Sequence, residues 1–474
     1  MTRYNVKSDL ASDYIHNGEI LATIEYAKAN AKNNALINEV LLKAAEGRGL
    51  SHREAMLLLE TDEWDVWDRI YSLAREIKQR IYGNRIVMFA PLYLSNYCVN
   101  GCVYCPYHAK NKVIPRRKLS QEEIRREVMA LQDMGHKRLA LEAGEHPVQN
   151  PIEYILESID TIYSIRHKNG AIRRVNVNVA ATSVENYRLL RNAGIGTYIL
   201  FQETYHRDTY ERLHPSGPKS DWSYHTEAMD RAMQGGIDDV GIGALFGLYD
   251  YRYDFVGLLM HAEHLEKVYG VGPHTISVPR IRPADDINPA DFPYAVADDV
   301  FRKIVAVLRL AVPYTGMIIS TRESRQCREQ VLDVGVSQLS GGSRTTVGGY
   351  ADSIGVEDKS AQFDISDNRT LDEIVGWLLS LGYIPSFCTA CYREGRTGDR
   401  FMSLAKTGQI GNCCAPNALM TLQEYLQDYA SPQVSELGKR AIASGLNMIP
   451  SDRTREIIRQ RLDDILNGKR DFRF

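Results

Sequence analysis

The chain has 474 residues, of which 44% are hydrophobic and 25% are charged. This composition is that of a globular protein with a substantial core, and it excludes a disordered, collagen-like or coiled-coil chain. The 57 Lys and Arg residues against 60 Asp and Glu residues give a net charge of −3. A chain with no excess of positive charge is not suited to bind nucleic acid or a membrane surface. We therefore expect small-molecule partners, no nucleic acid and no membrane.

The first residues are polar, and no later apolar run reaches the roughly 18 residues that a membrane span needs. We therefore expect a cytoplasmic protein. Eight cysteines are too few for a disulfide scaffold in a chain of this length, and six of them fall into two tight groups. In a reducing compartment this grouping favours metal binding over disulfides.

Residues 9–82 have a helical pattern throughout, with a capping box that begins at Ser51 and includes Glu54. We predict a helical N-terminal extension over residues 1–83. From Asn84 onward, short β-rich runs alternate with helical stretches such as 120–134 and 184–193. The predicted strands are 85–90, 137–141, 174–179, 197–201, 240–246, 275–278, 317–320 and 336–339.

This rhythm predicts an α/β fold, a TIM-type (β/α)8 barrel over residues 84–350. An open doubly wound sheet is the alternative. We favour the barrel because residues that can take part in catalysis or ligand binding recur just after successive strands. A barrel gathers such positions at one face. A glycine-rich stretch at 341–349 indicates a linker, and residues 351–474 are predicted to form a mainly helical C-terminal domain with its own cysteines.

The first cysteine group, Cys98, Cys102 and Cys105, follows the first predicted strand as a CxxxCxxC motif. Three thiolates are one fewer than a [4Fe-4S] cluster takes, so one iron would stay open for a substrate or cofactor. A zinc site or chance clustering of buried cysteines is the alternative. The spacing, the aromatic residue Tyr104 and the preceding strand favour the cluster.

This motif resembles the signature of the radical S-adenosylmethionine (SAM) enzymes. The resemblance implies that SAM chelates the open iron and that an electron from the cluster cleaves it to a 5′-deoxyadenosyl radical. The tripeptide after the second strand matches the family's contact to the SAM amino group, although glycine and glutamate there are commonly turn residues. The predicted cofactor-binding residues are Tyr104, Ala143, Gly144, Glu145, Gln202, Glu203 and Thr204.

The second group, in the C-terminal region, contains Cys388, Cys391, Cys413 and Cys414. A CxxC pair with a distant pair is a common zinc spacing, but adjacent cysteines rarely ligate one tetrahedral ion well. Given the first group, we favour a second [4Fe-4S] cluster with an open iron. Such a cluster indicates a second reaction site.

The sequence around these cysteines resembles the HydG family of [FeFe]-hydrogenase maturases. The family pattern has CxxC, 22 residues and a third cysteine, which selects Cys388, Cys391 and Cys414 as ligands of an auxiliary cluster and leaves Cys413 spare. The resemblance covers most of the chain, including residues 81–85, 201–206, 272–280, 320–323, 388–393 and 395–402.

The resemblance implies a radical SAM lyase that cleaves the Cα–Cβ bond of L-tyrosine to p-cresol and dehydroglycine. The small fragment would give carbon monoxide and cyanide, assembled into an Fe(CO)(CN) synthon for the hydrogenase H-cluster on an extra iron bridged by a free cysteine. Expected partners are an electron donor such as ferredoxin or flavodoxin and other hydrogenase maturation proteins, with a monomer as the default. The rivals are the tyrosine lyase of thiamine thiazole biosynthesis and a non-catalytic iron–sulfur scaffold or carrier.

Ser320, Thr321 and Arg322 end the seventh predicted strand, where a guanidinium fork and hydroxyls could grip the tyrosine carboxylate. The alternative is an arginine in an ion pair at a helix start. His274 opens the sixth strand, at the barrel end opposite the first cysteine group. A lone histidine there is more often a capping or surface residue, but the HydG resemblance makes it a predicted ligand of the extra iron.

Overall fold

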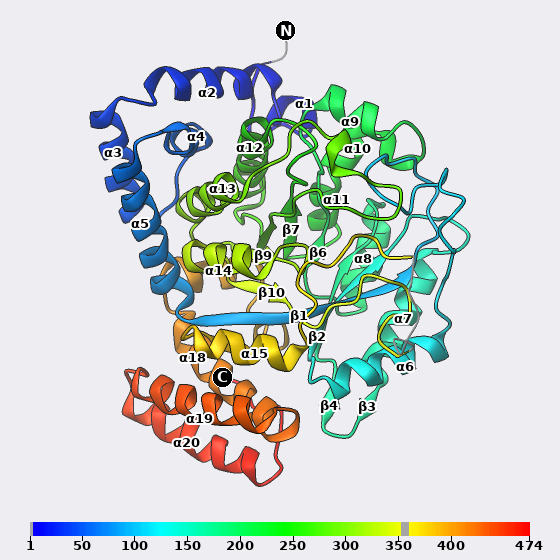
Figure 1. The fold of residues 1–474 in the computed structure, drawn as a ribbon, viewed down its shortest axis with the longest axis vertical. Helices are drawn as coiled ribbons and strands as arrows, with labels where there is room; N and C mark the ends of the chain where they lie inside the picture. The colour runs from blue at the N-terminus through cyan, green and yellow to red at the C-terminus, as the bar shows by residue number, and fades with distance from the viewer. Residues whose placement is uncertain (1–2, 352–359) are drawn as a thin grey trace.

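The computed structural model describes residues 3–351 and 360–474, and its centre is a closed barrel of parallel strands (Figure 1). Each strand pairs with its neighbour in chain order, and the last pairs with the first through Val87 and Gln338. The predicted TIM-type barrel is confirmed, and the doubly wound sheet is wrong because an open sheet would leave its edge strands unpaired. The barrel strands are β1 (Arg85–Ser95), β2 (Arg138–Ala143), β5 (Arg174–Asn178), β6 (Tyr198–Ile199), β7 (Val240–Gly243), β8 (Thr275–Ser277), β9 (Gly316–Ile319) and β10 (Gln338–Ser340).

Amphipathic helices surround the barrel (Figure 1). The first of them begins after Ser120, which forms a capping box with Glu123, and it buries one face that includes Ile124, Val128 and Leu131. The surrounding helices are α6 (Gln121–Asp133), α7 (Ile152–Ser164), α8 (Val184–Asn192), α9 (Arg207–Leu213), α10 (Trp222–Thr226), α11 (Ala228–Gln234), α12 (Tyr251–Tyr269), α13 (Asp298–Ala311) and α14 (Arg325–Val334).

The N-terminal region is helical, as predicted, and packs against α12 and α13 (Figure 1). His52, the first residue of α4, connects this helix to α12. Its backbone N–H and its Nδ1 both contact the Glu263 carboxylate of α12 at 2.8 Å. Within the described part of the chain, no helix combines the length and apolarity needed to cross a membrane. The N-terminal helices are α1 (Ala11–Tyr14), α2 (Asn17–Asn30), α3 (Asn34–Ala45), α4 (His52–Glu60) and α5 (Trp64–Tyr82).

The C-terminal region is mainly helical but also carries β11 (Ile384–Ser386), which the sequence pattern did not predict. This strand pairs in parallel with the start of β1, with Arg85 opposite Ile384. The division into domains at residues 83 and 350 stays a prediction, and residues 1–2 and 352–359 lie outside the described residues. The helices are α15 (Leu371–Ser380), α16 (Ala390–Arg393), α17 (Gly398–Lys406), α18 (Gly411–Asp428), α19 (Pro432–Asn447) and α20 (Asp452–Leu466), and a small hairpin of β3 (Arg166–His167) and β4 (Gly170–Ala171) lies on the barrel side.

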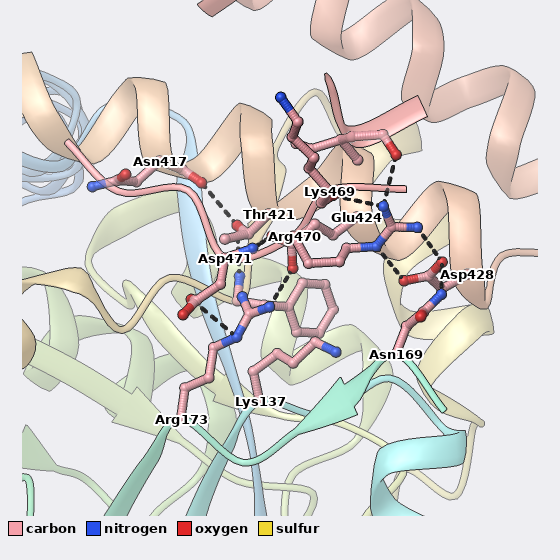
Figure 2. A network of polar contacts seen from close by, with 12 residues as sticks. Lys137, Asn169, Arg173, Asn417, Thr421, Glu424, Asp428, Lys469, Arg470 and Asp471 are labelled. Carbon is pink, nitrogen blue, oxygen red and sulfur yellow. Dashed lines mark hydrogen bonds and ion pairs between the residues drawn. The ribbon is translucent and has the colours of Figure 1, made fainter. Parts of the chain in front are cut away.

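A partly buried polar network attaches α18 and the residues after α20 to the barrel (Figure 2). Arg173, just before β5, forms ion pairs with Glu424 of α18 at 2.7 Å and with Asp471 at 3.2 Å. Asp471 also accepts two hydrogen bonds from Arg393, at 2.7 and 2.6 Å. Since Arg393 lies two residues after Cys391 of the second cysteine group, this network holds that loop at the N-terminal end of the barrel strands.

Candidate active site and auxiliary metal centre

The first cysteine group lies in the loop after β1, at the C-terminal end of the barrel strands. Cys98, Cys102 and Cys105 are free thiols that line one cavity. Backbone hydrogen bonds fix the loop, from Gly101 N to Ser216 O at 2.9 Å and from Cys105 N to Cys102 O at 3.2 Å. Three thiols therefore converge on one cavity at the mouth of the barrel.

The environment of these thiols fits an iron–sulfur cluster. Burial raises the pKa of Cys102 and Cys105 to about 12, so both are neutral unless a metal displaces their protons. A tetrahedral zinc ion would bring its sulfur ligands to about 3.8 Å from one another. Among the described His, Cys, Asp and Glu residues, only Asp298, Glu323 and Cys327 place three ligand atoms within 4.8 Å. The sulfur atoms of the first group are thus spread too widely for one ion, and a larger cluster fits them better.

The tripeptide Ala143-Gly144-Glu145 begins at the last residue of β2 and packs directly against the cysteine loop. Gly144 N donates to Ser95 O at 3.0 Å, and a Cβ at this position would clash with the carbonyl oxygen of Tyr97. The Glu145 carboxylate accepts from Asn100 Nδ2 at 2.6 Å. The chain therefore needs glycine here to bring the Glu145 carboxylate beside the thiols.

Two other predicted cofactor-binding residues line the same cavity. The Tyr104 hydroxyl is 2.7 Å from His214 Nε2, and Glu203 forms a 2.7 Å ion pair with Lys219. Glu203 has a φ of +68°, which is rare for a residue with a side chain and costs free energy. This strained backbone directs a carboxylate into the cavity.

The neighbours of Glu203 are turned toward the protein. Thr204 Oγ1 donates to the buried carboxylate of Asp254 at 2.8 Å. Gln202 is buried, and its Nε2 has no hydrogen-bond partner among the residues described. A contact of Gln202 or Thr204 with a cofactor stays a prediction.

The cavity continues into the barrel, where Arg322 is the central cationic group. No carboxylate partner of Arg322 occurs in the described ranges, and its guanidinium stacks on Phe363 at 3.6 Å. The ion pairs of this segment are made by the next residue, Glu323, with Arg280 and Arg282. Ser320 and Thr321 line the same part of the cavity. An unpaired guanidinium beside two hydroxyl groups is suited to bind a carboxylate.

Glu142, which the sequence analysis did not single out, also lines the barrel cavity. Alternate residues of β2 face inward, so Arg138, Ala140 and Glu142 lie at successive depths of the barrel. Burial raises the pKa of Glu142 to about 8, against the opposing effect of Arg322. The signal was present: Glu142 stands two positions after Ala140, in register with the inward positions of this strand.

The second cysteine group lies at the opposite end of the barrel. Cys388, Cys391 and Cys414 line one cavity together with His274. Cys413 does not line it, and its thiol donates to Ile410 O at 3.3 Å. The three cysteines chosen by the family pattern therefore share a cavity, whereas the spare one contacts backbone. As in the first group, the described sulfur atoms are not all within 4.8 Å of one another, which fits a cluster better than one zinc ion.

His274 is 8% exposed and lies among aromatic and polar side chains of this cavity. Its Nε2 is 3.4 Å from the Tyr392 hydroxyl, and its ring lies 4.6 Å from that of Phe401. Nδ1 has no hydrogen bond, although Asp239 is 3.4 Å away. Burial lowers the pKa of His274, so the ring is neutral, which is the form that binds a metal.

The two cavities are stacked along the barrel axis. Along β1 the lining passes from Val87 in the lower cavity to Phe89 in the barrel cavity, and along β10 from Gln338 to Ser340. Each pair is two residues apart on one strand, so both members face the interior. The barrel cavity therefore lies between the two cysteine groups.

Comparisons with known proteins agree with this geometry. Residues 92–259 match the radical SAM superfamily, and residues 277–384 match the biotin and thiamin synthesis associated domain. The 2-iminoacetate synthase of Salmonella typhimurium is 31% identical over 72% of this chain and 88% of its own length.

Two solved structures resemble the whole chain. A crystal structure of HydG, a maturase of the [FeFe]-hydrogenase, matches with a TM-score of 0.94 and 55% identity, covering 98% of this chain and 100% of that one. HydG from Carboxydothermus hydrogenoformans matches with a TM-score of 0.81 and 38% identity, covering 96% and 100%.

Proposed function

This chain belongs to the HydG family of radical SAM enzymes, and we propose from this premise that it is a tyrosine lyase that makes carbon monoxide and cyanide. It cleaves the Cα–Cβ bond of L-tyrosine to p-cresol and dehydroglycine at the first centre. It then converts the small fragment at the auxiliary centre and assembles an Fe(CO)(CN) synthon for the [FeFe]-hydrogenase H-cluster.

The observation that carries this proposal is the arrangement of the two cysteine trios. They lie at opposite ends of one barrel, with a cavity between them that Arg322 and Glu142 line. A simple iron–sulfur carrier needs neither two separated three-cysteine sites nor a cavity between them.

At the first centre, Cys98, Cys102 and Cys105 would hold a [4Fe-4S] cluster, and Glu145 and the Gly144 backbone would receive the amino group of SAM. When bound, the cluster and SAM supply the one-electron chemistry that removes a hydrogen atom from the tyrosine amino group. Glu203 and Tyr104, on the same cavity, are assigned to the rest of the cofactor.

The substrate lies in the barrel cavity. The guanidinium of Arg322 binds the tyrosine carboxylate in bidentate fashion, and the hydroxyls of Ser320 and Thr321 orient it. Glu142, protonated at pH 7 because its pKa is about 8, donates a hydrogen bond to the substrate. The enclosing barrel wall keeps water away from the reacting bond.

At the auxiliary centre, Cys388, Cys391 and Cys414 hold the second [4Fe-4S] cluster. The neutral imidazole of His274, together with a free cysteine, would hold the extra iron, which would supply the metal of the synthon. An electron donor such as ferredoxin or flavodoxin and other hydrogenase maturation proteins are the partners that this role requires.

The test is anaerobic. The protein is reconstituted with iron and sulfide and supplied with L-tyrosine, SAM and dithionite, and p-cresol, cyanide and carbon monoxide are quantified, the last by trapping on a haem protein. We expect all three products. No p-cresol from protein that holds both clusters would refute the tyrosine lyase.

The second candidate is the tyrosine lyase of thiamine biosynthesis, because curated 2-iminoacetate synthases match 72% of this chain. It predicts p-cresol without carbon monoxide, so the same assay separates the two activities. Failure to cleave SAM at all would favour the iron–sulfur scaffold instead.

A further inference from the structure

Two buried arginines line the cavity of the auxiliary cysteines. Arg85 and Arg138 are the first residues of β1 and β2, and they are 9% and 7% exposed. Both line the cavity that also holds Cys388, Cys391 and His274. The sequence analysis assigned neither of them a role.

Neither arginine has a carboxylate partner in the described parts of the chain. Arg138 Nη2 donates to Cys388 O at 2.9 Å, and its Nε has no partner. The guanidinium of Arg85 lies 5.2 Å from the ring of Tyr82. No Asp or Glu is among the described residues that line this cavity.

Buried arginines of this chain are satisfied in different ways: Arg309 donates to backbone carbonyls, at 2.7 Å to Pro313 O and at 2.7 Å to Gly335 O, whereas two others pair with carboxylates. Arg328 pairs with Asp367 at 2.5 Å, and Arg173 pairs with Glu424 at 2.7 Å. A buried charge without a partner is unfavourable, and among the described residues Arg138 keeps an unpartnered Nε on a cavity without acidic lining residues, so an anion in this cavity would stabilise both guanidinium groups.

The auxiliary cluster accounts for only part of that requirement. An oxidised [4Fe-4S] core with three thiolates carries a charge of about −1, and a ferrous ion with a doubly deprotonated cysteine adds about zero. Asp239, 3.4 Å from His274, and Arg174, which stacks on Tyr392 at 4.2 Å, add one charge of each sign beside the cavity and offset each other. The two guanidinium groups of Arg85 and Arg138 would therefore exceed the charge of the metal centre by about one unit. One further monovalent anion would neutralise the cavity.

We propose that Arg85 and Arg138 form a binding subsite for one small monocarboxylate, and that its occupant is the two-carbon α-imino acid left by tyrosine cleavage. Planar guanidinium forks bind carboxylates in bidentate geometry. The subsite lies directly below the barrel cavity in which that fragment would form. The identity of the occupant rests on the proposed function, whereas the carboxylate chemistry rests on the two arginines.

The experiment measures binding, not turnover. Anaerobic holoprotein with both clusters is dialysed to equilibrium against radiolabelled glyoxylate, the stable α-oxo acid formed when the imino acid hydrolyses. We expect about one bound equivalent. Arg85→Gln and Arg138→Gln should each weaken binding by about tenfold or more, because each removes a charged hydrogen-bond donor.

The matched control is Arg174→Gln. Arg174 also lacks a carboxylate ion pair among the described residues and stacks on Tyr392 at 4.2 Å, but it does not line this cavity. Its substitution should leave glyoxylate binding unchanged. Iron and sulfide contents verify both clusters in every variant, and p-cresol release should persist in Arg85→Gln because cleavage occurs at the other end of the barrel.

A competition experiment on the wild-type protein tests the subsite even if the arginine variants fail to hold the cluster. Acetate should displace glyoxylate, and acetamide, its neutral isostere, should not. Equal displacement by both, or equal glyoxylate binding by all variants, would overturn the subsite. If labelled L-cysteine, and not glyoxylate, loses affinity in the two arginine variants, the fragment is not the occupant. Because glyoxylate binding needs no tyrosine cleavage, a protein that makes no p-cresol can still pass this test.

Discussion

At the scale of single residues, the proposed chemistry depends on two ionisable side chains of the barrel cavity: Arg322, which has no carboxylate partner in the described ranges, and Glu142, which hydrogen-bonds to Asn178. Arg322 and Glu142 face the same cavity, and their environments differ because one keeps its charge and the other is held neutral by burial. Each assignment leads to a distinct kinetic expectation.

Arg322→Lys should lower kcat/KM for tyrosine by about tenfold to a hundredfold, because lysine keeps the charge but loses the bidentate fork. SAM cleavage without tyrosine should be unchanged. Arg325→Lys, at an exposed position that pairs with Glu329 at 3.4 Å, serves as the control. An equal loss of SAM cleavage in Arg322→Lys would contradict the carboxylate role.

The pKa of Glu142 is raised to about 8 by burial, so its carboxyl group donates a hydrogen bond below that pH and loses its proton above it. The rate of p-cresol release should fall as the pH rises through about 8. In Glu142→Gln the side chain stays neutral, and this decline should disappear. Persistence of the same decline in the variant would show that another group titrates.

At the scale of elements, Cys413 and Cys414 are neighbours near the start of α18, but only Cys414 lines the auxiliary cavity. Cys414→Ala should lose about half of the reconstituted iron and sulfide, because one of two four-iron clusters would be missing. Cys413→Ala is the matched control and should retain both, since this thiol contacts backbone. Both variants should still release p-cresol. Loss of iron in Cys413→Ala with retention in Cys414→Ala would reverse the ligand assignment.

The contact between α4 and α12 should make stability depend on pH. Burial would lower the pKa of His52, but Glu263 and Glu19 outweigh it and raise this pKa above 6.5. A raised native pKa stabilises the fold fully below 6.5, and this stabilisation is lost as the pH rises through the native pKa. His52→Gln should therefore lower the melting temperature more at pH 6 than at pH 9. The same decrease at both values would contradict a charged His52.

At the scale of the whole molecule, the barrel could be predicted because each of its strands has a distinct β-rich run, and neighbouring strands follow in chain order. The cysteine loop after β1 was predictable for the same reason. The three-residue β11 was not, because its pairing with β1 depends on the docking of the C-terminal region. Glu142, Arg85 and Arg138 could not be recognised as residues of the barrel interior from the sequence. Only the closed barrel determines which face of each strand points inside.

One strand joins the two metal centres. β1 crosses the whole barrel (Figure 1), with the auxiliary cavity at Arg85 and the first cysteine loop just beyond Ser95. Ten residue steps of about 3.3 Å make it about 33 Å long. Electrons do not tunnel rapidly between protein cofactors over such a distance. Clusters held at the two ends of this strand would therefore be electrically insulated from one another, and reduction of one would leave the oxidation state of the other unchanged.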